Sequence, residues 1–455
     1  MQTDFFKGKK ITLMRVGLIG RGIGDARFIA EAGGEVLVVD DAPQSVMQPA
    51  VDALSDISNI HFKFGPYDFL DFKEADLVLV GAGAPLEEPV LLECKKAGVL
   101  LAQSAALFAK LAGIPIIGIT GTRGKSTVTH MIHHVLSVAT GEEILLGGNV
   151  RGVSNLQLLH QVKEDSLCVM ELDSWQLQGF GWAEISPHVS IFTNFMEDHL
   201  NYYERGGKTK AEAMALYFFD KAQIFLHQEE SGVLVTTPEV FEMTKTYLPK
   251  ETLGQEIILA DASVLPEDML LSMPGEHNRL NAALAYEALL AMGLTEEEIF
   301  TGLASFAGVE GRLQLIGTIA GVRVYNDNNA TTPQATTVAL EALALEEKHI
   351  VLIAGGADKN IDSQKLADTI VSSCKLVLLT PGSGTDRLLS ELASRGYADV
   401  VAVENLSVAV EEAKLAATAP DVILFSPAFA SFSQYKNEYE RNDEFMSLMV
   451  THEQE

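Results

Sequence analysis

The stretch Ile114-Pro-Ile-Ile-Gly-Ile-Thr-Gly-Thr-Arg-Gly-Lys-Ser-Thr127 carries the strongest structural signal in this chain. Its first half is an apolar run that predicts a buried strand ending at Thr120. The strand leads directly into the loop Gly121-Thr-Arg-Gly124, and a helical pattern follows from Lys125. A glycine loop between a strand and a helix aims backbone NH groups and a helix N-terminus at phosphate oxygens. The stretch therefore predicts a phosphate-binding loop.

The residues of this loop are suited to binding a nucleotide phosphate and its metal ion. Lys125 is placed to reach the outer phosphates, and the Ser126 hydroxyl is a magnesium ligand in such loops. Ile119 stands where the strict GxxxxGK[ST] pattern has its first glycine, so the match is to a variant. The other candidate nucleotide-binding residues of the loop are Gly121, Thr122, Arg123, Gly124 and Thr127.

A second glycine-rich turn lies near the N-terminus. Arg15–Leu18 predicts a short strand that enters Gly20-Arg-Gly22-Ile-Gly24, and a helix and a strand at Glu35–Val39 follow. Asp40 ends that strand, where an acid that binds a ribose hydroxyl would stand. Asp25 replaces the third glycine of the dinucleotide motif. A nicotinamide dehydrogenase stays open on this segment alone, although two separate nucleotide sites explain the whole chain better.

Strands and helices alternate along the rest of the chain. A helix is expected near Pro89–Ala97. Further strands are expected at Ala75–Val80, Ser166–Glu171, Val189–Thr193, Ile350–Ile353, Leu376–Leu379, Val400–Val403 and Val422–Phe425. The alternation predicts an α/β protein with largely parallel sheets and three domains. We expect a Rossmann-like N-terminal domain at 1–110, a central P-loop-type domain at 111–308 and a Rossmann-like C-terminal domain at 309–455.

Composition narrows the possible partners. The formal net charge of −29 argues against a nucleic-acid partner, because affinity for the phosphate backbone depends on many Lys and Arg side chains. Small anionic ligands are still compatible with the charge, because local backbone NH groups and a few cations hold them. No segment resembles a signal peptide, and no apolar run reaches the roughly 18 residues of a membrane span. We therefore expect a cytoplasmic protein without membrane insertion.

The cysteines predict no covalent or metal framework. Cys94, Cys168 and Cys374 are far apart and form no CxxC pair, so they indicate neither a disulfide nor a zinc site. Three other residues are candidate metal ligands downstream of the loop: Glu171, His199 and Lys221. Magnesium favours carboxylates, so Glu171 is the natural ligand among them. Taken singly, each of the three also fits a structural or solvent-exposed role.

Many of these segments resemble, in order and spacing, the motifs of the Mur ligase family. They are TGTRGKST at 120–127, GGN at 147–149, ELDSWQL at 171–177, DHL at 198–200, GEHNRLNAALA at 275–285, GR at 311–312, NDNNATTP at 326–333, GGADK at 355–359 and SPAFASFSQYKNEYERNDEF at 426–445. The resemblance covers nearly the whole chain. The NDNNAT and terminal segments are most similar to the family members that add D-glutamate to UDP-N-acetylmuramoyl-L-alanine.

The resemblance implies an ATP-dependent ligase that forms an amide bond through an acyl phosphate in peptidoglycan precursor synthesis. The N-terminal domain would hold the UDP-sugar, the central domain ATP, and the C-terminal domain the incoming amino acid, which this likeness predicts to be D-glutamate. Its small-molecule partners would be UDP-N-acetylmuramoyl-L-alanine, glutamate and ATP. We expect two Mg²⁺ ions and a monomer.

The resemblance also assigns residues. It places Asp40, Gly83, Asn149 and His199 near the UDP-sugar, with His199 also close to metal. ATP and magnesium would be served by Lys125, Ser126, Glu171, Asn278, Asn281, Arg312 and Asp327. The acceptor would be served by Thr331, Lys359 and Ser431. Lys221 matches the family lysine that reacts with CO₂ to form a carbamate, a carboxylate-like magnesium ligand, if an insertion near Gly206–Glu212 is assumed. The catalytic candidates are therefore Lys125, His199 and Lys221.

Four positions depart from the family pattern. Arg123 stands where Asn or His is common, and Asp173 replaces a serine. Asn329 replaces the lysine of NDxKAT, and Glu438 replaces an aromatic residue. The last two lie in the region expected to bind the acceptor. They leave open a Mur-like ligase with a different acceptor, and a non-catalytic UDP-sugar or nucleotide sensor is a third interpretation.

Overall fold

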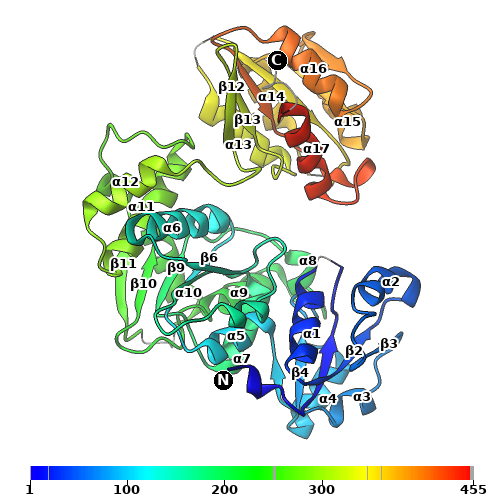
Figure 1. The fold of residues 1–455 in the computed structure, drawn as a ribbon. Coiled ribbons are helices and arrows are strands. Elements are labelled where there is room, and N and C mark those ends of the chain that lie inside the picture. Colours follow the sequence, from blue (N-terminus) through cyan, green and yellow to red (C-terminus); the bar gives the residue numbers. More distant parts are fainter. Residues whose placement is uncertain (1, 19, 250–252, 346, 360, 451–455) are drawn as a thin grey trace. The chain divides into compact units, whose positions relative to one another are not determined.

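The computed structural model describes residues 2–18, 20–249, 253–345, 347–359 and 361–450. Its strands form three sheets in two compact units. The first unit comprises Met1–Val264 and Asn281–Gly302, and it contains the N-terminal and central sheets (Figure 1). The second comprises Leu265–Leu280 and Leu303–Glu455, and it contains the C-terminal sheet. The expected α/β class is confirmed.

The N-terminal sheet is parallel throughout, with strand order β3-β2-β1-β4-β5. Its strands are β1 (Lys10–Met14), β2 (Glu35–Asp40), β3 (Ile60–Phe64), β4 (Leu77–Val80) and β5 (Leu101–Ala102). Two groups of helices pack on it through separate apolar clusters. The first group is α1 (Arg21–Glu31), α2 (Gln44–Ala53) and α5 (Ser104–Ala112), and the second is α3 (Leu70–Lys73) and α4 (Pro89–Ala97).

The expected strand at Arg15–Leu18 is wrong, because the first strand is Lys10–Met14. Lys10 and Thr12 interrupt the apolar run in the sequence, yet β1 lies between β2 and β4 and pairs with both. Arg15 has a φ of 60°, a left-handed conformation that ends the strand. The turn before α1 therefore begins at Arg15, and Gly22 and Gly24 lie in the helix rather than in the turn.

The central sheet is also parallel, with strand order β11-β10-β9-β6-β8-β7. Its strands are β6 (Ile116–Thr120), β7 (Leu145–Gly148), β8 (Cys168–Glu171), β9 (Val189–Phe192), β10 (Val233–Thr236) and β11 (Glu256–Leu259). The helices of this region are α6 (Lys125–Thr140), α7 (Ser174–Ala183), α8 (Leu200–Tyr203), α9 (Lys210–Ala222), α10 (Pro238–Tyr247), α11 (Glu276–Ala291) and α12 (Glu296–Ser305). The phosphate loop thus follows an inner strand of the sheet.

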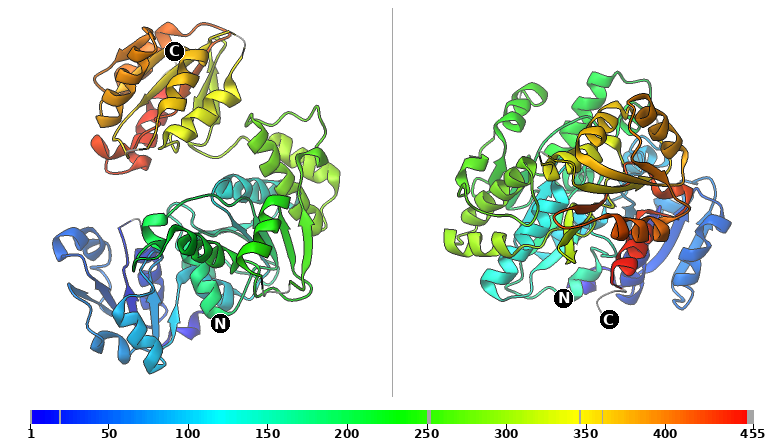
Figure 2. Two further views of the ribbon diagram at one scale, coloured as in Figure 1. Left: turned by 180° about the vertical axis from the view of Figure 1, so that it is seen from behind. Right: turned by 90° about the horizontal axis from the view of Figure 1, so that it is seen from above.

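The C-terminal sheet has strand order β12-β13-β17-β14-β15-β16, and only its edge pair β12–β13 is antiparallel. The strands are β12 (Gln314–Ile319), β13 (Val322–Asn326), β14 (Ile350–Gly355), β15 (Cys374–Thr380), β16 (Val400–Ala402) and β17 (Val422–Phe425). Helices cover both faces (Figure 2). One face carries α13 (Pro333–Leu343), α14 (Gln364–Ser373) and α15 (Ser383–Ser394), and the other α16 (Leu406–Ala416) and α17 (Glu438–Val450).

Short 3-10 helices complete the described elements. They are η1 (Gln2–Phe5), η2 (Gln157–His160), η3 (Ala262–Val264) and η4 (Ser431–Ser433). Cys94, Cys168 and Cys374 are free thiols, and all three are buried. Within the described ranges, we find no helix whose length and apolar character would let it cross a bilayer.

Candidate active site

The phosphate loop joins β6 to α6, as predicted. Gly124 caps the helix with a φ of 79°, and the first helical residue is Lys125. A side chain at Gly121 would collide with the Thr193 hydroxyl, and a side chain at Gly124 would collide with the Asn281 carboxamide. Both glycines have positive φ, so glycine alone fits these two positions. Asn281, a predicted nucleotide residue, therefore lies directly beside the loop.

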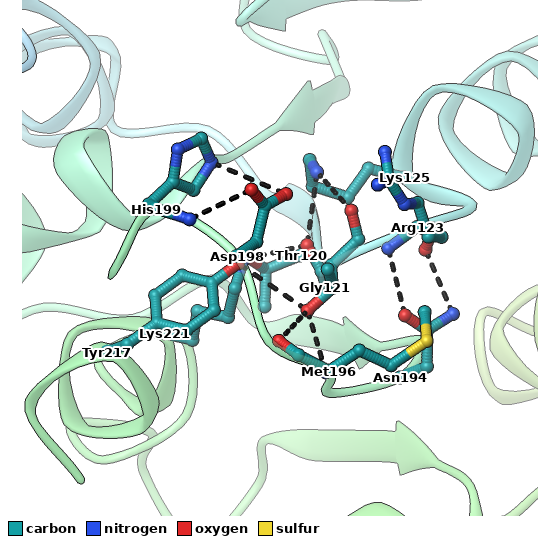
Figure 3. A network of polar contacts seen from close by, with 11 residues as sticks. Thr120, Gly121, Arg123, Lys125, Asn194, Met196, Asp198, His199, Tyr217 and Lys221 are labelled. Carbon is teal, nitrogen blue, oxygen red and sulfur yellow. Dashed lines mark hydrogen bonds and ion pairs between the residues drawn. The ribbon is translucent and has the colours of Figure 1, made fainter. Parts of the chain in front are cut away.

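Asn194, which follows β9, holds the loop in place (Figure 3). Its Oδ1 accepts a hydrogen bond from the Arg123 NH at 2.8 Å, and its Nδ2 donates to the Arg123 carbonyl at 3.1 Å. Its own carbonyl accepts from the Thr122 NH at 2.9 Å. These bonds fix the loop before any phosphate binds, so little ordering is left for the nucleotide to cause.

Two lysine amines converge on one carbonyl of the loop. Lys125 Nζ donates to the Gly121 carbonyl at 3.0 Å, and Lys221 Nζ donates to the same oxygen at 2.7 Å. Lys221 comes from α9 and is only 1% exposed. Burial, and then the charge of Lys125, lower the pKa of Lys221 well below its ordinary value. The neutral amine is therefore favoured at this position.

His199 stands at the start of α8, beside the two lysines. Its ring lies 4.6 Å from the Trp175 ring and 5.9 Å from the Tyr217 ring, measured between centroids. Its backbone NH donates to Asp198 Oδ1 at 2.8 Å. Burial lowers the pKa of His199 below its ordinary value, against the opposing charge of Asp198. The neutral imidazole, which can act as a metal ligand, is therefore favoured.

Glu171 ends β8 next to the loop strand and is 6% exposed. Asn149 lies against it: the Asn149 NH donates to the Glu171 carbonyl at 2.7 Å, and Asn149 Nδ2 donates to Glu171 Oε1 at 3.3 Å. Gly148 permits this approach, because a side chain there would collide with the backbone of Glu171. The structure thus places Glu171, a predicted metal ligand, against Asn149, a predicted UDP-sugar residue.

A cavity of about 190 Å³ lies at the N-terminal glycine turn. Arg15, Gly17, Arg21 and Gly22 are among its lining residues. The sequence candidates for the UDP-sugar lie on the same edge of this parallel sheet, since Asp40 ends β2 and Gly83 follows β4.

The two UDP-sugar candidates of this edge have further contacts of their own. Asp40 is buried, which raises the pKa of its carboxyl, and its Oδ1 accepts from the Ala42 NH at 3.0 Å. Gly83 has a φ of 84° and approaches the Trp175 ring. Trp175 also lies against the His199 ring, so this turn is close to the phosphate-loop region.

In the C-terminal unit, the acceptor candidates gather at the carboxyl edge of the sheet. Lys359 Nζ donates to Thr331 Oγ1 at 3.1 Å. Ser431 is buried and follows Ala430, whose backbone pairs with Ala357. The three residues follow β13, β14 and β17, which are neighbours in the sheet.

Asp327, a nucleotide candidate, already has protein partners. Its Oδ1 accepts from the Leu313 NH at 3.0 Å, and its Oδ2 accepts from the Ser426 hydroxyl at 2.7 Å. Burial raises the pKa of Asp327 to about 7. Arg312 is exposed and precedes Leu313, whose NH binds Asp327. Another nucleotide candidate, Asn278, donates from Nδ2 to the Pro274 carbonyl at 3.0 Å. Asp327 therefore positions the Arg312 turn, whatever else it binds.

Three residues that depart from the family pattern, Asp173, Asn329 and Glu438, form hydrogen bonds in the structure. Asp173 caps α7 and forms a capping box with Gln176, a role that serine and aspartate share. Asn329 Nδ2 donates to the Glu310 carbonyl at 3.3 Å. Glu438 begins α17, and its carbonyl accepts from Asn328 Nδ2 at 2.9 Å.

Sequence reasoning missed Asn194, Arg21 and the role of Asp25. Asn194 carried a usable signal, because a polar residue just after a parallel strand lies on the ligand-binding edge. Arg21 bonds to Asn149, and Asp25 accepts hydrogen bonds from Ser154 Oγ at 2.6 Å and the Leu156 NH at 3.2 Å. These contacts join residues more than a hundred positions apart, which no local pattern reveals.

A preformed phosphate loop with two lysines and a buried carboxylate, on the carboxyl edge of a parallel sheet, defines a nucleotide-binding α/β protein. Residues 119–289 match the Mur ligase middle domain, and residues 311–429 match the Mur ligase, glutamate ligase domain. The UDP-N-acetylmuramoylalanine--D-glutamate ligase of Roseiflexus sp. (strain RS-1) is 30% identical, over 97% of this chain and 98% of that protein. The protein of the same name from Synechococcus sp. (strain CC9605) is 31% identical, over 95% of this chain and 97% of its own length.

A solved structure agrees on the fold. The UDP-N-acetylmuramate-alanine ligase of Thermotoga maritima superposes with a TM-score of 0.58 at 20% identity, covering 96% of this chain and 98% of its own. The chain belongs to the Mur ligase family. Members of this family are ATP-dependent ligases that form amide bonds, and this chain is such an enzyme. The expected three-domain α/β fold is confirmed.

Proposed function

We propose that this protein joins glutamate, as the D-isomer, to UDP-N-acetylmuramoyl-L-alanine at the expense of ATP, a step of peptidoglycan precursor synthesis. The observation that carries the proposal is near-full-length similarity to D-glutamate ligases in a chain whose phosphate loop is intact. In the first step a carboxylate oxygen attacks the γ-phosphorus of ATP and ADP leaves. In the second the amino nitrogen attacks the acyl carbon, phosphate leaves, and the nitrogen loses a proton.

The phosphate loop suits the first step. The carboxylate is a poor electrophile until phosphate becomes its leaving group, and the transferring phosphoryl group carries negative charge that needs stabilisation. The N-terminus of α6 and the Lys125 amine both lie at the loop where the phosphates would bind, and that amine now donates to the Gly121 carbonyl. We assign ATP to this loop together with Asn278, Asn281, Arg312 and Asp327, and the UDP-sugar to Asp40, Gly83, Asn149 and His199.

The residues near the loop fit magnesium. Within the described residues, no cluster of three or more His, Cys, Asp or Glu side chains forms a metal cage. Magnesium commonly uses one or two protein carboxylates and takes its other ligands from water and substrate phosphates. Buried Glu171 and the Ser126 hydroxyl supply that kind of partial donor set, and neutral His199 adds a nitrogen. Bound magnesium would offset charge on the phosphoryl group. We propose two ions.

We also propose that Lys221 is carbamylated. A neutral amine attacks CO₂: a nitrogen–carbon bond forms, the nitrogen loses a proton, and an anionic carbamate results. Burial and Lys125 lower the pKa of Lys221, so the reactive neutral form is favoured. The carbamate would replace repulsion from Lys125 by attraction and supply the second carboxylate-like ligand to magnesium.

Lys359, Thr331 and Ser431 are our candidates for the acceptor, because a second carboxylate on glutamate needs cationic or hydroxyl partners. We propose domain boundaries of 1–110, 111–308 and 309–455, a monomeric protein and a cytoplasmic location.

Two residues favour a second candidate acceptor. Asn329 stands where D-glutamate ligases have a lysine, which removes a cation, and Glu438 stands where they have an aromatic residue, which adds an anion. That alternative is a Mur-like ligase for another amino acid.

One assay tests the proposal. Purified protein, ATP, Mg²⁺ and UDP-N-acetylmuramoyl-L-alanine are incubated with D-Glu, L-Glu, D-Asp, L-Lys or meso-diaminopimelate, while phosphate release and product mass are recorded together. We expect phosphate release and a product only with D-Glu. Preference for a basic amino acid would overturn the glutamate assignment, and no turnover with any pair would favour a sensor.

A further inference from the structure

Arg21 connects the N-terminal glycine turn to the carboxylate of the central sheet. It is the first residue of α1, and its Nη1 donates a hydrogen bond to Asn149 Oδ1. Asn149 in turn donates from Nδ2 to Glu171 Oε1 at 3.3 Å. A guanidinium, an amide and a carboxylate thus form a continuous chain between two sheets.

The chemistry of the chain fixes the orientation of the amide. A guanidinium can only donate hydrogen bonds, and an ionised carboxylate can only accept them. Asn149 satisfies both neighbours in one orientation alone, with its oxygen toward Arg21 and its NH₂ toward Glu171. Without Arg21 the amide is no longer held in that orientation, and in the flipped one its oxygen would face the carboxylate.

The backbone around the chain is also fixed. The Asn149 NH binds the Glu171 carbonyl at 2.7 Å, and Gly148 allows no larger residue in that approach. On the other side, α1 is docked onto the loop that follows Asn149 through buried Asp25, which accepts hydrogen bonds from Ser154 and Leu156. Arg21 and Asn149 therefore lie at a set distance rather than meeting by chance.

We propose that Arg21 is a positioning residue for the magnesium carboxylate Glu171, acting through the Asn149 amide. The inference rests on the proposed function, in which Glu171 binds magnesium. Asn149 occupies Oε1 of Glu171, which would leave Oε2 for the metal. The N-terminal domain then completes the metal site of the central domain, although it supplies no direct ligand.

The test measures metal binding without turnover. Mn²⁺ replaces Mg²⁺, ADP is present, and free Mn²⁺ is followed by electron paramagnetic resonance. Groups that orient a metal ligand are worth about 10- to 100-fold in metal affinity, so we expect Arg21→Met to weaken Mn²⁺ binding at least tenfold. Arg27→Met is the matched control, because Arg27 lies on the same helix but bonds Asp56 at the surface. It should change Mn²⁺ affinity by less than about twofold.

Three further variants separate positioning from general damage. Asn149→Ala should weaken Mn²⁺ binding as much as Arg21→Met, and the double variant should lose no more, because both act through one path. Arg21→Lys keeps a donor and should recover part of the affinity. Melting temperatures of all variants are recorded, so that variants of equal stability can be compared. The positioning role of Arg21 is supported if Arg21→Met loses Mn²⁺ affinity and an equally stable Arg27→Met does not.

The outcomes distinguish this inference from the proposed function. If Glu171→Gln leaves Mn²⁺ affinity unchanged, the magnesium assignment itself fails. If Glu171→Gln abolishes binding while Arg21→Met binds Mn²⁺ like the unmodified protein, the assignment stands and the positioning role is wrong. Additive losses in the double variant would also overturn it, since they mean that Arg21 does not act through Asn149.

Discussion

Two buried basic side chains, one in each compact unit, show how similar burial leads to different chemistry. Lys221 is 1% exposed and Arg441 is 4% exposed. Both donate to backbone carbonyls: Lys221 to Gly121 at 2.7 Å, and Arg441 to Asn328 at 2.9 Å. In both, burial lowers the pKa. In burial, and in donating to a backbone carbonyl, the two side chains are alike.

The two side chains differ in how readily each loses its proton. The pKa of Lys221 falls well below its ordinary value, which favours a neutral, nucleophilic amine. The pKa of Arg441 falls only to about 10, so it stays charged at neutral pH. Arg441 also donates from Nε to Asn328 Oδ1 at 2.8 Å and from Nη1 to the Phe429 carbonyl at 3.2 Å. We infer that Lys221 serves chemistry and that Arg441 holds α17 onto the sheet.

The largest effect is expected from Lys125→Ala, which removes the second amine that donates to the Gly121 carbonyl. Lys125 should act mainly on charge that develops in the transition state, so we expect kcat to fall by about 1,000-fold. The melting temperature should change little, because Lys125 is only partly buried. Steady-state phosphate release and thermal unfolding measure the two effects. A near-normal kcat would remove Lys125 from the reaction.

Lys221→Ala is expected to have the next largest effect. Loss of a carbamate that binds magnesium should lower kcat by about 100-fold, as loss of a metal-site group commonly does. Short-chain carboxylic acids should restore part of the activity by replacing the carbamate, and acetate titration of the variant measures this. Crystallographic analysis of the unmodified protein should show the added CO₂. An active Lys221→Ala variant, or a bare amine in a well-defined map, would contradict the proposal.

Arg441→Met should affect stability rather than chemistry. It leaves the Asn328 and Phe429 carbonyls and the Asn328 side chain without their donor, which costs about 3 kcal/mol in comparable buried sites. Urea unfolding should show an earlier transition for the C-terminal unit, while ADP binding at the phosphate loop persists. If the variant unfolds like the parent, Arg441 does not hold α17.

Asp327→Asn tests a smaller electrostatic effect. The pKa of Asp327 is raised from 3.8 to about 7, so between these values the folded chain binds more protons than the unfolded chain. The contribution of this group to stability therefore falls as pH rises from about 4 to 7. The asparagine variant should have a flatter melting temperature across that range. An unchanged pH profile would mean that Asp327 ionises normally.

How far the sequence predicts the molecule depends on the range of the interactions. The phosphate loop, most parallel strands and α4 at Pro89–Ala97 follow from local patterns of apolar residues and glycine. The strand Lys10–Met14 was misplaced, because pairing on both sides outweighs its polar residues. The site shows the same limit: Lys221 and Gly121 meet across a hundred residues, so their contact required the fold.

The smallest effect is expected from Glu438→Phe, which restores the aromatic residue of D-glutamate ligases. Glu438 stands in the first turn of α17, where an acidic side chain favours the helix, and its charge acts on Arg441 three residues later. Both features account for a glutamate here without any contact to the acceptor. We therefore expect the ranking of D-Glu, L-Glu, D-Asp, L-Lys and meso-diaminopimelate to stay the same, with kcat/KM for D-Glu within about twofold, as for surface charges. Competition assays on both proteins measure this.

If Glu438 lines the pocket, its carboxylate would repel the second carboxylate of glutamate, and the phenylalanine variant would then gain D-Glu selectivity. Such a gain would place Glu438 in the acceptor site and show that the C-terminal unit, unlike the phosphate loop, had changed its chemistry.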